Sequence, residues 1–524
     1  ACVEVLKDKK DYLRSWKSES LTGNLRSDLM LKRTLVANRG EIACRILRAC
    51  REAGIECVAI HADNDSGTLF TELADISVKL EGEGLAETYL NQEQILQIAI
   101  DNGCDSVHPG FGFLSERADF AQAVMDAGLI WIGPSPEAIT KMGDKMTARI
   151  TMKAAGVPVI PGEEVSGGLP EVLEIAPSVG YPLLLKATAG GGGKGMRAVH
   201  KQEDLEVEAK AAMREALNAF GDDRIYVERL LTGSRHIEIQ VLADKYGRTI
   251  HLGERECSIQ RRHQKVFEES PSVALDGELR EAMGSAACDA ARAVSYEGAG
   301  TVEFLVTPKG EFFFLEMNTR IQVEHPVTEM VTGVDLVREQ LRIAGGEPMS
   351  CGSLNMRGHA IEVRLYAEDP SNNFLPAIGE LKKFIAPSGP GVRLDTGVRE
   401  GDFVTPDYDP MLAKLIVWAP SRIEALQRMA RALDEFVVLG CRTNVRFLRE
   451  LCTHPDVVDG WTTTDMIERL WPDGWSSDLT GQVFNAGLLI AAACESTNHG
   501  KRVFTSSKTE EMPSTFASID RRFP

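Results

Sequence analysis

A glycine-rich stretch, Ala189-Gly-Gly-Gly-Gly-Lys194-Gly-Met196, follows closely on the apolar run Tyr181-Pro-Leu-Leu-Leu-Lys186. Four consecutive glycines after a predicted strand form a loop without side-chain bulk, so its backbone N–H groups can approach an anion closely. Lys194 adds a positive charge, and a nucleoside triphosphate is the ligand that such a loop suits. The spacing does not fit the Walker A pattern. A flexible linker has the same composition, so this interpretation needs support from elsewhere in the chain.

The charge balance excludes several classes of function. Lys and Arg number 58 against 77 Asp and Glu, which leaves a net charge of −19. This excess argues against nonspecific binding of nucleic acid, and any phosphate site must therefore be built locally. No run of about 18 apolar residues predicts a membrane span. The 11 cysteines contain no C-x-x-C pair, which indicates a reducing compartment.

The first 30 residues mix lysines with acidic residues and lack an apolar core. They match neither a secretory signal nor a mitochondrial transit peptide. We therefore expect a cytoplasmic protein. An organelle such as the mitochondrion stays open, because a processed transit peptide leaves no trace in a mature chain.

Strands and helices alternate from residue 31 to about residue 145. Thr34–Ala37 is a short apolar strand, Asn38–Gly40 a turn, and Cys57–Ile60 the next strand after a helical pattern. This alternation predicts an α/β unit with a parallel sheet. The turn lacks G-x-G-x-x-G, so it does not indicate a nicotinamide dinucleotide site.

The later regions differ in character. A small section with the glycine-rich loop resembles a lid, a strand-rich α+β region follows, and a mixed region comes after it. The tail contains a short apolar helix predicted at 484–494 and a polar stretch beyond it. The predicted boundaries are 1–30 for an N-terminal extension, 31–145 for the α/β unit and 146–230 for the lid-like section. They are 231–358 for the strand-rich region, 359–475 for the mixed region, and 476–524 for a tail or the start of a linker.

A predicted hairpin carries candidate metal ligands. Its turn is Pro308–Gly310, and Glu303 and Glu316 lie on its two arms, with Asn318 two residues beyond Glu316 on the same face. Two carboxylates and an amide oxygen suit Mg²⁺ or Mn²⁺, which bridge the β and γ phosphates of ATP. The alternative is that both glutamates face solvent.

Arg320, Gln322 and Glu324 follow at alternate positions, which predicts that they continue the polar face of this strand. A cation, an amide and a carboxylate beside a metal site indicate a cleft, although a surface salt-bridge ladder has the same pattern.

Two further segments leave alternatives open. The dense polar run Gly253–Lys265 is a solvated loop, or it brings Gln260, His263 and Lys265 to an anionic ligand. His236 begins an alternating strand, either as a structural histidine or as a ligand.

Together these motifs closely resemble the biotin carboxylase component of the biotin-dependent carboxylases, an ATP-grasp family. The resemblance covers about residues 31–475, and the strings that carry it are Val36–Ala43, His108–Glu116, Met142–Lys145, the glycine-rich loop, Glu256–Lys265, Glu316–Glu329, His359–Arg364 and Tyr408–Met411.

The resemblance implies an ATP-grasp fold: an N-terminal Rossmann-like biotin carboxylase domain, a glycine-rich lid, a central subdomain and a mixed C-terminal domain. It implies carboxylation of the ureido N1 of biotin by bicarbonate, with MgATP cleaved through carboxyphosphate. Glu303, Glu316 and Asn318 would bind Mg²⁺ or Mn²⁺. The residues it implies for ATP are Lys145, Lys186, Gly191, Gly192, Gly193, Lys194, Gly195, Met196, Glu228, Arg229, Leu231, His236, Gln260 and His263.

The resemblance also implies the catalytic roles. Bicarbonate would be held by Lys265, Arg320, Gln322 and the backbone of Val323, with Glu324 as the base that deprotonates it. Arg320 would orient the same anions, and Arg364 would stabilise the biotin enolate.

The chain lacks a Met-Lys-Met acceptor motif, so biotin is expected as a substrate on a carrier protein or domain outside it. The chain is therefore expected to be a subunit or a fragment of a longer one. Its expected partners are this carrier, a carboxyltransferase subunit and a second copy in a homodimer or larger complex, and neither nucleic acid nor membrane. We expect the first half-reaction of an acyl-CoA carboxylase; the alternatives are a pyruvate or 2-oxo-acid carboxylase, another ATP-grasp ligase such as a carbamoyl-phosphate ligase, and a non-enzymatic ATP-binding subunit.

Overall fold

The computed structural model describes residues 31–476, apart from 166–167, 188–195, 221–223, 263 and 353. The glycine-rich loop from Gly190 to Gly195, His263, the N-terminal extension and the helix predicted at 484–494 therefore lie outside the described residues.

The N-terminal part is a five-stranded parallel sheet in the order β3-β2-β1-β4-β5, which confirms the predicted α/β unit. Leu35 and Val36 are neighbours on β1 and belong to two different cores, because helices cover both faces of a parallel sheet. The elements are β1 (Arg33–Val36), α2 (Gly40–Glu52), β2 (Glu56–His61), α3 (Leu69–Leu73), β3 (Ile76–Lys79), α4 (Gly84–Glu87), α5 (Gln92–Asp101), β4 (Ser106–His108), α6 (Ala118–Asp126), β5 (Ile130–Trp131) and α7 (Pro136–Gly143).

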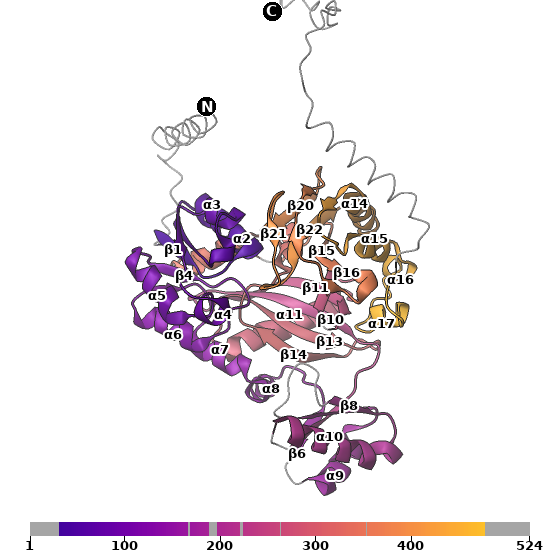
Figure 1. Cartoon of the computed structure of the whole chain (residues 1–524). Helices are drawn as coiled ribbons and strands as arrows, with labels where there is room; N and C mark the ends of the chain where they lie inside the picture. The colour runs from indigo at the N-terminus through magenta and orange to yellow at the C-terminus, as the bar shows by residue number, and fades with distance from the viewer. Residues whose placement is uncertain are drawn as a thin grey trace, which may run out of the picture. The chain divides into compact units, whose positions relative to one another are not determined.

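The section that carries the glycine-rich loop is a four-stranded antiparallel sheet in the order β6-β9-β7-β8, with α9 and α10 packed on it (Figure 1). By contrast α8 packs on the central core through Ala148 and Met152, so its residues do not share the core of this small sheet. The elements are α8 (Lys145–Ala154), β6 (Gly162–Val165), α9 (Leu169–Val179), β7 (Leu183–Ala187), β8 (Met196–Val199), α10 (Leu205–Phe220) and β9 (Ile225–Arg229).

The remaining chain builds one eight-stranded antiparallel sheet in the order β14-β13-β10-β11-β12-β15-β22-β20. The boundary predicted between residues 358 and 359 stays a prediction, and the sheet continues across it. The strands are β10 (Arg235–Ala243), β11 (Thr249–Arg261), β12 (Gln264–Ser270), β13 (Gly298–Val306), β14 (Phe312–Asn318), β15 (His359–Tyr366), β20 (Val392–Thr396) and β22 (Met411–Ala419).

Strict alternation divides this sheet into an apolar face and a polar face. On β10, Ile237 and Ile239 pack on one side in a core that includes Met283 of α11. Side chains of successive strand residues point to opposite faces, so His236 and Glu238 share the other face. Both are nevertheless buried, which means that the polar face is enclosed. The sheet therefore carries a core on one side and a polar interior on the other.

The helices and short strands around this sheet complete the fold. Val363 on β15 packs in one core with Met429 of α14 and Phe447 of α15. The remaining elements are α11 (Gly277–Ala293), α12 (His325–Thr332), α13 (Leu336–Ala344), α14 (Arg422–Glu435), α15 (Val445–Thr453), α16 (Pro455–Val458), α17 (Met466–Leu470), and the strand pairs β16 (Glu368–Asp369) with β17 (Leu375–Pro376), β18 (Gly379–Glu380) with β21 (Phe403–Val404) and β19 (Lys383–Ile385) with β23 (Val437–Leu439).

The predicted hairpin is confirmed, and Glu303 is paired directly with Glu316 across β13 and β14. The prediction that the strand continues through Glu324 is wrong. β14 ends at Asn318, and residues 319–324 form a loop that leads into α12. The described part of the run Gly253–Lys265 is not a solvated loop either, because residues 253–261 and 264–265 belong to the paired strands β11 and β12 at the centre of the sheet.

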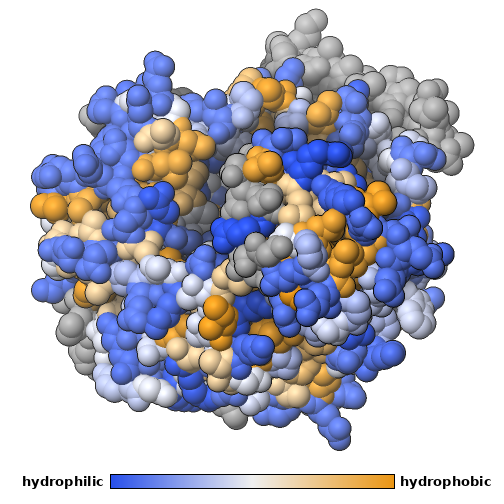
Figure 2. Space-filling view, turned by 90° about the horizontal axis from the view of Figure 1, so that it is seen from below, coloured by the Kyte–Doolittle hydropathy of each residue, from blue (hydrophilic) through white to orange (hydrophobic). Residues whose placement is uncertain are grey.

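The face shown in Figure 2 is mainly hydrophilic, with hydrophobic side chains interspersed in small groups. Among the residues that the structure describes, no helix combines the length and the apolar character needed to cross a membrane.

A buried lysine joins the N-terminal unit to the large sheet. Lys414 on β22 is fully buried, and its Nζ lies 3.1 Å from Glu41 Oε1 on α2 and 3.8 Å from Asp395 Oδ2 on β20. The same Nζ donates to the carbonyl of Val323 at 2.9 Å. Burial works to lower the pKa of Lys414, but the carboxylates of Glu41, Glu362 and Asp395 raise it, so the lysine stays charged.

Replacing Lys414 with methionine removes the cation that pairs with the buried Glu41, whereas Asp395 keeps its ion pair with Arg393. We expect the free energy of unfolding to fall by about 3–5 kcal/mol, measured as a lower urea midpoint. Lys141→Met is the control, because that partly exposed lysine forms a surface ion pair with Glu137 one helical turn away, and its loss should leave the midpoint nearly unchanged. Equal midpoints for the two variants would contradict this account.

Candidate active site

The centre of the polar face is Lys265 on β12, which lies among three buried carboxylates. Its Nζ is 2.6 Å from Glu238 Oε2, 2.8 Å from Glu303 Oε1 and 2.6 Å from Glu324 Oε1. Desolvation works to lower the pKa of Lys265, but the three carboxylates raise it well above its usual value. The ammonium therefore stays charged and holds β10, β13 and the loop before α12 together.

Glu303 is the most heavily bonded of these carboxylates. Its Oε1 accepts hydrogen bonds from Asn318 Nδ2 at 2.9 Å and Gln322 Nε2 at 2.7 Å, in addition to Lys265. Its Oε2 lies 3.0 Å from His236 Nε2. Burial alone would raise the pKa of Glu303, but Lys265 and His236 hold it well below its ordinary value. Glu303 is therefore ionised, and the solvent-facing alternative is wrong for it.

Glu316, the cross-strand partner of Glu303, is exposed. Desolvation, followed by the like charge of Glu303, raises its pKa. A carboxylate destabilised by a second carboxylate gains from a cation placed between them. Two carboxylates with the amide of Asn318 beside them form a donor set that fits a hard divalent cation.

Glu324 lies between two cations. Besides Lys265 it contacts Arg364 on β15, whose Nη2 donates to Glu324 Oε2 at 3.0 Å while its Nε donates to Glu268 Oε1 at 2.6 Å. Burial works to raise the pKa of Glu324, but Lys265 and Arg364 hold it well below its usual range. Burial raises the pKa of Glu268 to about 7, in spite of Arg364. Glu324 is thus an ionised carboxylate whose basicity depends on how tightly these cations remain paired with it.

The loop of residues 319–324 is anchored from both sides. Arg320 Nε lies 3.1 Å from Glu116 Oε2 of the N-terminal unit, and its Nη2 donates to Asn318 Oδ1 at 2.9 Å. The carbonyl of Val323 is engaged by Lys414, as described above. Although this loop is not a strand, it brings Arg320, Gln322 and Glu324 to the polar face where Lys265 lies.

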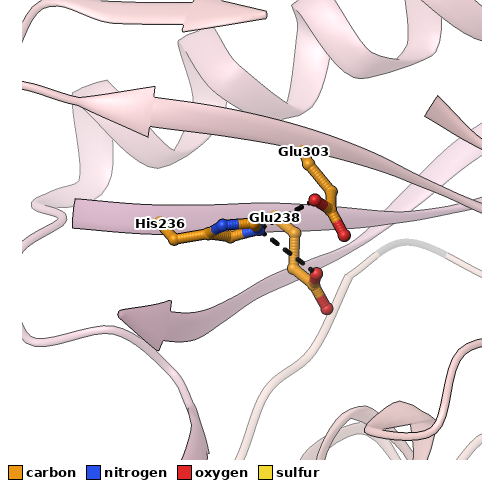
Figure 3. Close-up of side chains that lie close together, drawn as sticks. All are labelled: His236, Glu238 and Glu303. Carbon is orange, nitrogen blue, oxygen red and sulfur yellow. Dashed lines mark ion pairs between the residues drawn. The ribbon is translucent and has the colours of Figure 1, made fainter. Parts of the chain in front are cut away.

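His236, Glu238 and Glu303 converge closely enough to suggest a metal centre (Figure 3). Lys265 already donates to both carboxylates, so its ammonium supplies the positive charge that a metal ion would bring. Gln260 Nε2 lies 3.0 Å from His236 Nδ1 and joins the histidine to β11. The pair of the buried Glu303 and the exposed Glu316 therefore fits a divalent cation better than this triad does.

The other predicted nucleotide residues lie on the small sheet and on α8. Lys186 on β7 forms an ion pair with Glu228 on β9. The backbone N–H of Arg229 donates to the carbonyl of Pro161, so this N–H already has a hydrogen-bond partner within the protein. Leu231 follows β9, Met196 begins β8, and Lys145 begins α8 with an exposed side chain. In the described residues, then, Lys186 and Glu228 pair with each other rather than with the Lys265 cluster.

A cavity of about 520 Å³ opens beside Arg364 and Arg320. Its wall is largely aromatic and apolar, with Phe111, Phe113, Tyr366, Tyr408 and Met411 among its lining residues. The guanidinium carbon of Arg39 lies 3.8 Å from the centroid of the Tyr408 ring, which ties the N-terminal unit to this wall. The cavity offers a flat, uncharged molecule a position next to three arginines, Arg39, Arg320 and Arg364.

Several residues of the site were not among those predicted from the sequence. Glu238 could have been found, because it alternates with His236 and Gln240 along β10. Arg255 lies in the polar run Gly253–Lys265 and Glu116 ends the string His108–Glu116, but nothing local indicates the contacts of these residues or of Glu268. Their contacts join strands and loops that are far apart in the chain, and only the folded sheet brings these together.

The family models that match the chain are the biotin carboxylase N-terminal domain at residues 30–139, the ATP-binding domain of the carbamoyl-phosphate synthase L chain at 144–351, and the biotin carboxylase C-terminal domain at 362–469. Biotin carboxylase 1 of Bacillus subtilis is 49% identical over 443 residues, which are 84% of this chain and 98% of that protein.

Two other relatives extend the comparison. The mitochondrial methylcrotonoyl-CoA carboxylase subunit alpha of rice is 48% identical over 88% of this chain and 64% of its own length. The biotin carboxylase domain dimer of the Hydrogenobacter thermophilus 2-oxoglutarate carboxylase, solved with MgADP, ADP and bicarbonate, is 45% identical with a TM-score of 0.78, and the match covers 84% of this chain and 98% of that one.

The raised pKa of Glu268 predicts a pH dependence of stability. In the folded protein Glu268 keeps its proton up to about pH 7, whereas in the unfolded chain it loses the proton near the ordinary pKa of 4.5. The folded state therefore binds more protons than the unfolded state in this range, and the free energy of unfolding falls as the pH rises. Between pH 6 and pH 8 the loss is about 1 kcal/mol. We expect Glu268→Gln to show a smaller fall in urea midpoint over this interval than the wild type; an equal or larger fall would refute the assignment.

Proposed function

Since this chain belongs to the biotin carboxylase family, we propose that it carboxylates biotin with bicarbonate at the expense of MgATP. The observation that carries this proposal is the position of Glu324, an ionised carboxylate between Lys265 and Arg364 on an enclosed polar face. The two cations beside Glu324 attract an anionic substrate, and they bring it next to a carboxylate that can accept its proton.

Bicarbonate would enter among Lys265, Arg320, the amide N–H₂ of Gln322 and the backbone N–H of Val323. The bond from Lys414 Nζ to the Val323 carbonyl holds this residue in place, and its N–H is the group able to donate to an anion. As bicarbonate takes over Lys265 as a partner, Glu324 loses part of its stabilisation and its basicity rises. Glu324 then accepts the bicarbonate proton.

The deprotonated oxygen attacks the γ-phosphorus of MgATP, the bond to the β-γ bridging oxygen breaks, and ADP leaves. The product is carboxyphosphate. When MgATP is bound, its divalent cation neutralises charge on the phosphates, and Glu303, Glu316 and Asn318 would hold it. Lys145, Lys186 and the glycine-rich loop would hold the phosphates, and Glu228, Arg229, Leu231, His236, Gln260 and His263 would line the rest of the nucleotide site.

Carboxyphosphate breaks at the bond between its carboxyl carbon and the bridging oxygen, which releases CO₂ and phosphate. The phosphate takes the proton from biotin N1, and this nitrogen then bonds to the carbon of CO₂. Arg364 would stabilise the negative charge that appears on the ureido oxygen of biotin. The aromatic cavity beside Arg364 is suited to the flat ureido ring.

We further propose that biotin arrives on a carrier outside this chain, that a carboxyltransferase subunit completes the reaction, and that the chain pairs with a second copy. An acyl-CoA is the proposed final acceptor, as in the rice relative, and a 2-oxo acid is the alternative, as in the Hydrogenobacter protein. The described cysteines are all free thiols, which supports the proposal of a cytoplasmic or other reducing compartment.

Glu324→Gln tests the proposed base. We expect phosphate release from MgATP that depends on bicarbonate and rises with free biotin, and a loss of about 10²–10⁴-fold in the variant, because a glutamine cannot accept the proton. Glu329→Gln is the matched control, since Glu329 is buried on α12 but pairs with Arg45 and Arg393 instead of Lys265. Release that is indifferent to bicarbonate would favour another ATP-grasp ligase.

Glu316→Gln tests the cation site. Removing one of two carboxylates should raise the Mg²⁺ or Mn²⁺ concentration for half-maximal phosphate release by about tenfold, or about 1.4 kcal/mol. The exposed Glu311, at the start of the same hairpin arm, provides the control Glu311→Gln. Identical cation requirements in the two variants would show that Glu316 does not hold the cation.

A further inference from the structure

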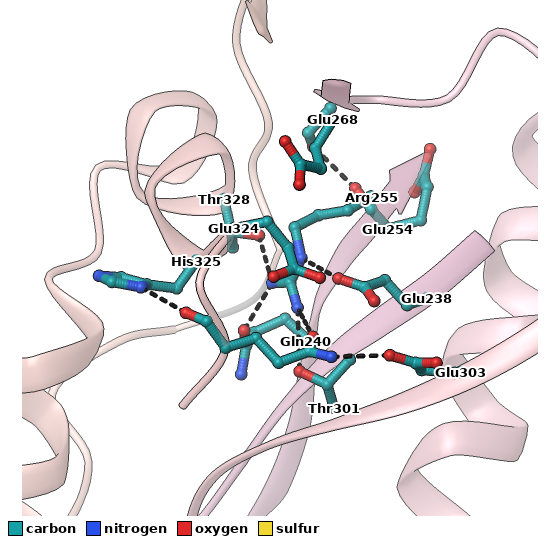
Figure 4. Close-up of polar contacts among 12 residues, drawn as sticks. Glu238, Gln240, Glu254, Arg255, Glu268, Thr301, Glu303, Glu324, His325 and Thr328 are labelled. Carbon is teal, nitrogen blue, oxygen red and sulfur yellow. Dashed lines mark hydrogen bonds and ion pairs between the residues drawn. The ribbon is translucent and has the colours of Figure 1, made fainter. Parts of the chain in front are cut away.

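Arg255 on β11 is a buried cation to which the proposed mechanism gives no role. Its side chain has 0% exposure. A guanidinium has five N–H donors, and burying it is costly unless each of them finds an acceptor. Desolvation works to lower the pKa of Arg255, but the nearby carboxylates of Glu238 and Glu324 raise it, so the guanidinium is charged. Figure 4 shows it at the centre of the polar contacts.

All five donors are used, and the acceptors come from four elements. Nε donates to Glu238 Oε1. Nη1 donates to Gln240 Oε1 at 2.6 Å and to Thr328 Oγ1 at 3.0 Å. Nη2 donates to Thr301 Oγ1 at 2.9 Å and to Gln322 Oε1 at 2.7 Å. One side chain therefore joins β10, β13, the loop before α12 and α12 itself.

The bond to Gln322 decides which end of that amide faces the site. Only the amide oxygen can accept from the guanidinium, so the N–H₂ group points the other way and donates to Glu303 Oε1 at 2.7 Å. A reversed amide would place N–H₂ against the guanidinium and leave a buried donor without an acceptor. Arg255 thus holds Gln322 in the orientation that offers its donors to an anion.

The bond to Glu238 acts on Lys265 in a similar way. Arg255 holds Glu238 Oε1, and the other oxygen of the same carboxylate accepts from Lys265 Nζ at 2.6 Å. The ammonium is thereby kept in a fixed position from which it also reaches Glu324 Oε1 at 2.6 Å. Arg255 thus acts on Gln322 directly and on Lys265 through Glu238, although it is not itself one of the donors proposed to bind bicarbonate.

We propose that Arg255 is a positioning residue that sets the affinity for bicarbonate by fixing Gln322 and Lys265 before the anion arrives. The inference rests on the proposed function, because it takes these two side chains as bicarbonate donors. An interaction that orients groups in advance spares the anion the cost of ordering them.

Arg255→Lys tests the inference, because lysine keeps the positive charge but has three donors on one atom and cannot span the same acceptors. Phosphate release is measured over a series of bicarbonate concentrations and a series of MgATP concentrations. We expect the KM for bicarbonate to rise at least about tenfold and the KM for MgATP to change less than about threefold.

Arg280→Lys is the matched control. Arg280 on α11 holds the buried Glu254, the residue before Arg255 on the same strand and therefore on the other face of the sheet. This variant should lower the thermal midpoint and leave the KM for bicarbonate unchanged.

The double variant Arg255→Lys/Gln322→Ala separates positioning from general damage to the fold. If Arg255 acts largely through Gln322, the KM for bicarbonate of the double variant should lie well below the value that the two single effects predict when multiplied. Effects that multiply fully, or an unchanged KM in Arg255→Lys, would overturn the inference while the wild type still shows bicarbonate-dependent release. A wild type without that dependence would overturn the proposed function as well.

Two milder variants keep the inference falsifiable if Arg255→Lys does not fold. Thr301 shares Nη2 with Gln322, whereas Thr328 shares Nη1 with Gln240. Thr301→Val should therefore raise the KM for bicarbonate more than Thr328→Val does. Equal values for the two variants would count against the inference.

Discussion

The site depends on a balance of buried charges around Lys265. An ammonium removed from water is tolerated only when carboxylates surround it, and here Glu238, Glu303 and Glu324 do so within 2.8 Å. Each of these carboxylates is in turn held by another donor from a different element. Because no member can leave without exposing an unpaired charge, the cluster defines the relative positions of β10, β12, β13 and the loop before α12.

The large sheet makes such a cluster possible, because its two faces are chemically distinct. Ile237, Ile239 and Val241 on β10 pack on α11, whereas His236 and Glu238 point the other way. β15 repeats this division with Val363 on the apolar core and Arg364 on the polar face. The apolar face stabilises the sheet by burial, which allows the opposite face to carry charges that would destabilise a core.

Some of this architecture could be predicted from local pattern. The parallel sheet and the hairpin follow from period-two and period-3.6 hydrophobicity and from a turn at Pro308–Gly310. The direct pairing of Glu303 with Glu316 does not, because the strand register shifts between Phe304 and Glu303. The path of residues 319–324 could not be predicted either. Their alternation of polar and apolar residues has the period of a strand, but hydrogen-bonded partners end at Asn318, and the loop is held instead by Glu116 and Lys414.

The residue types of the site and their order can be taken from the chain alone, because motifs such as Glu316–Glu329 keep carboxylates, amides and cations close together along it. Which of these residues meet depends on the folded protein. Lys265 and Glu324 are 59 positions apart and Arg255 and Gln322 are 67 apart, and they meet because the loop before α12 packs on the polar face of the sheet. The reason is physical: the charge and the hydrogen-bonding capacity of a side chain are local properties, whereas its burial and its partners depend on every strand packed around it.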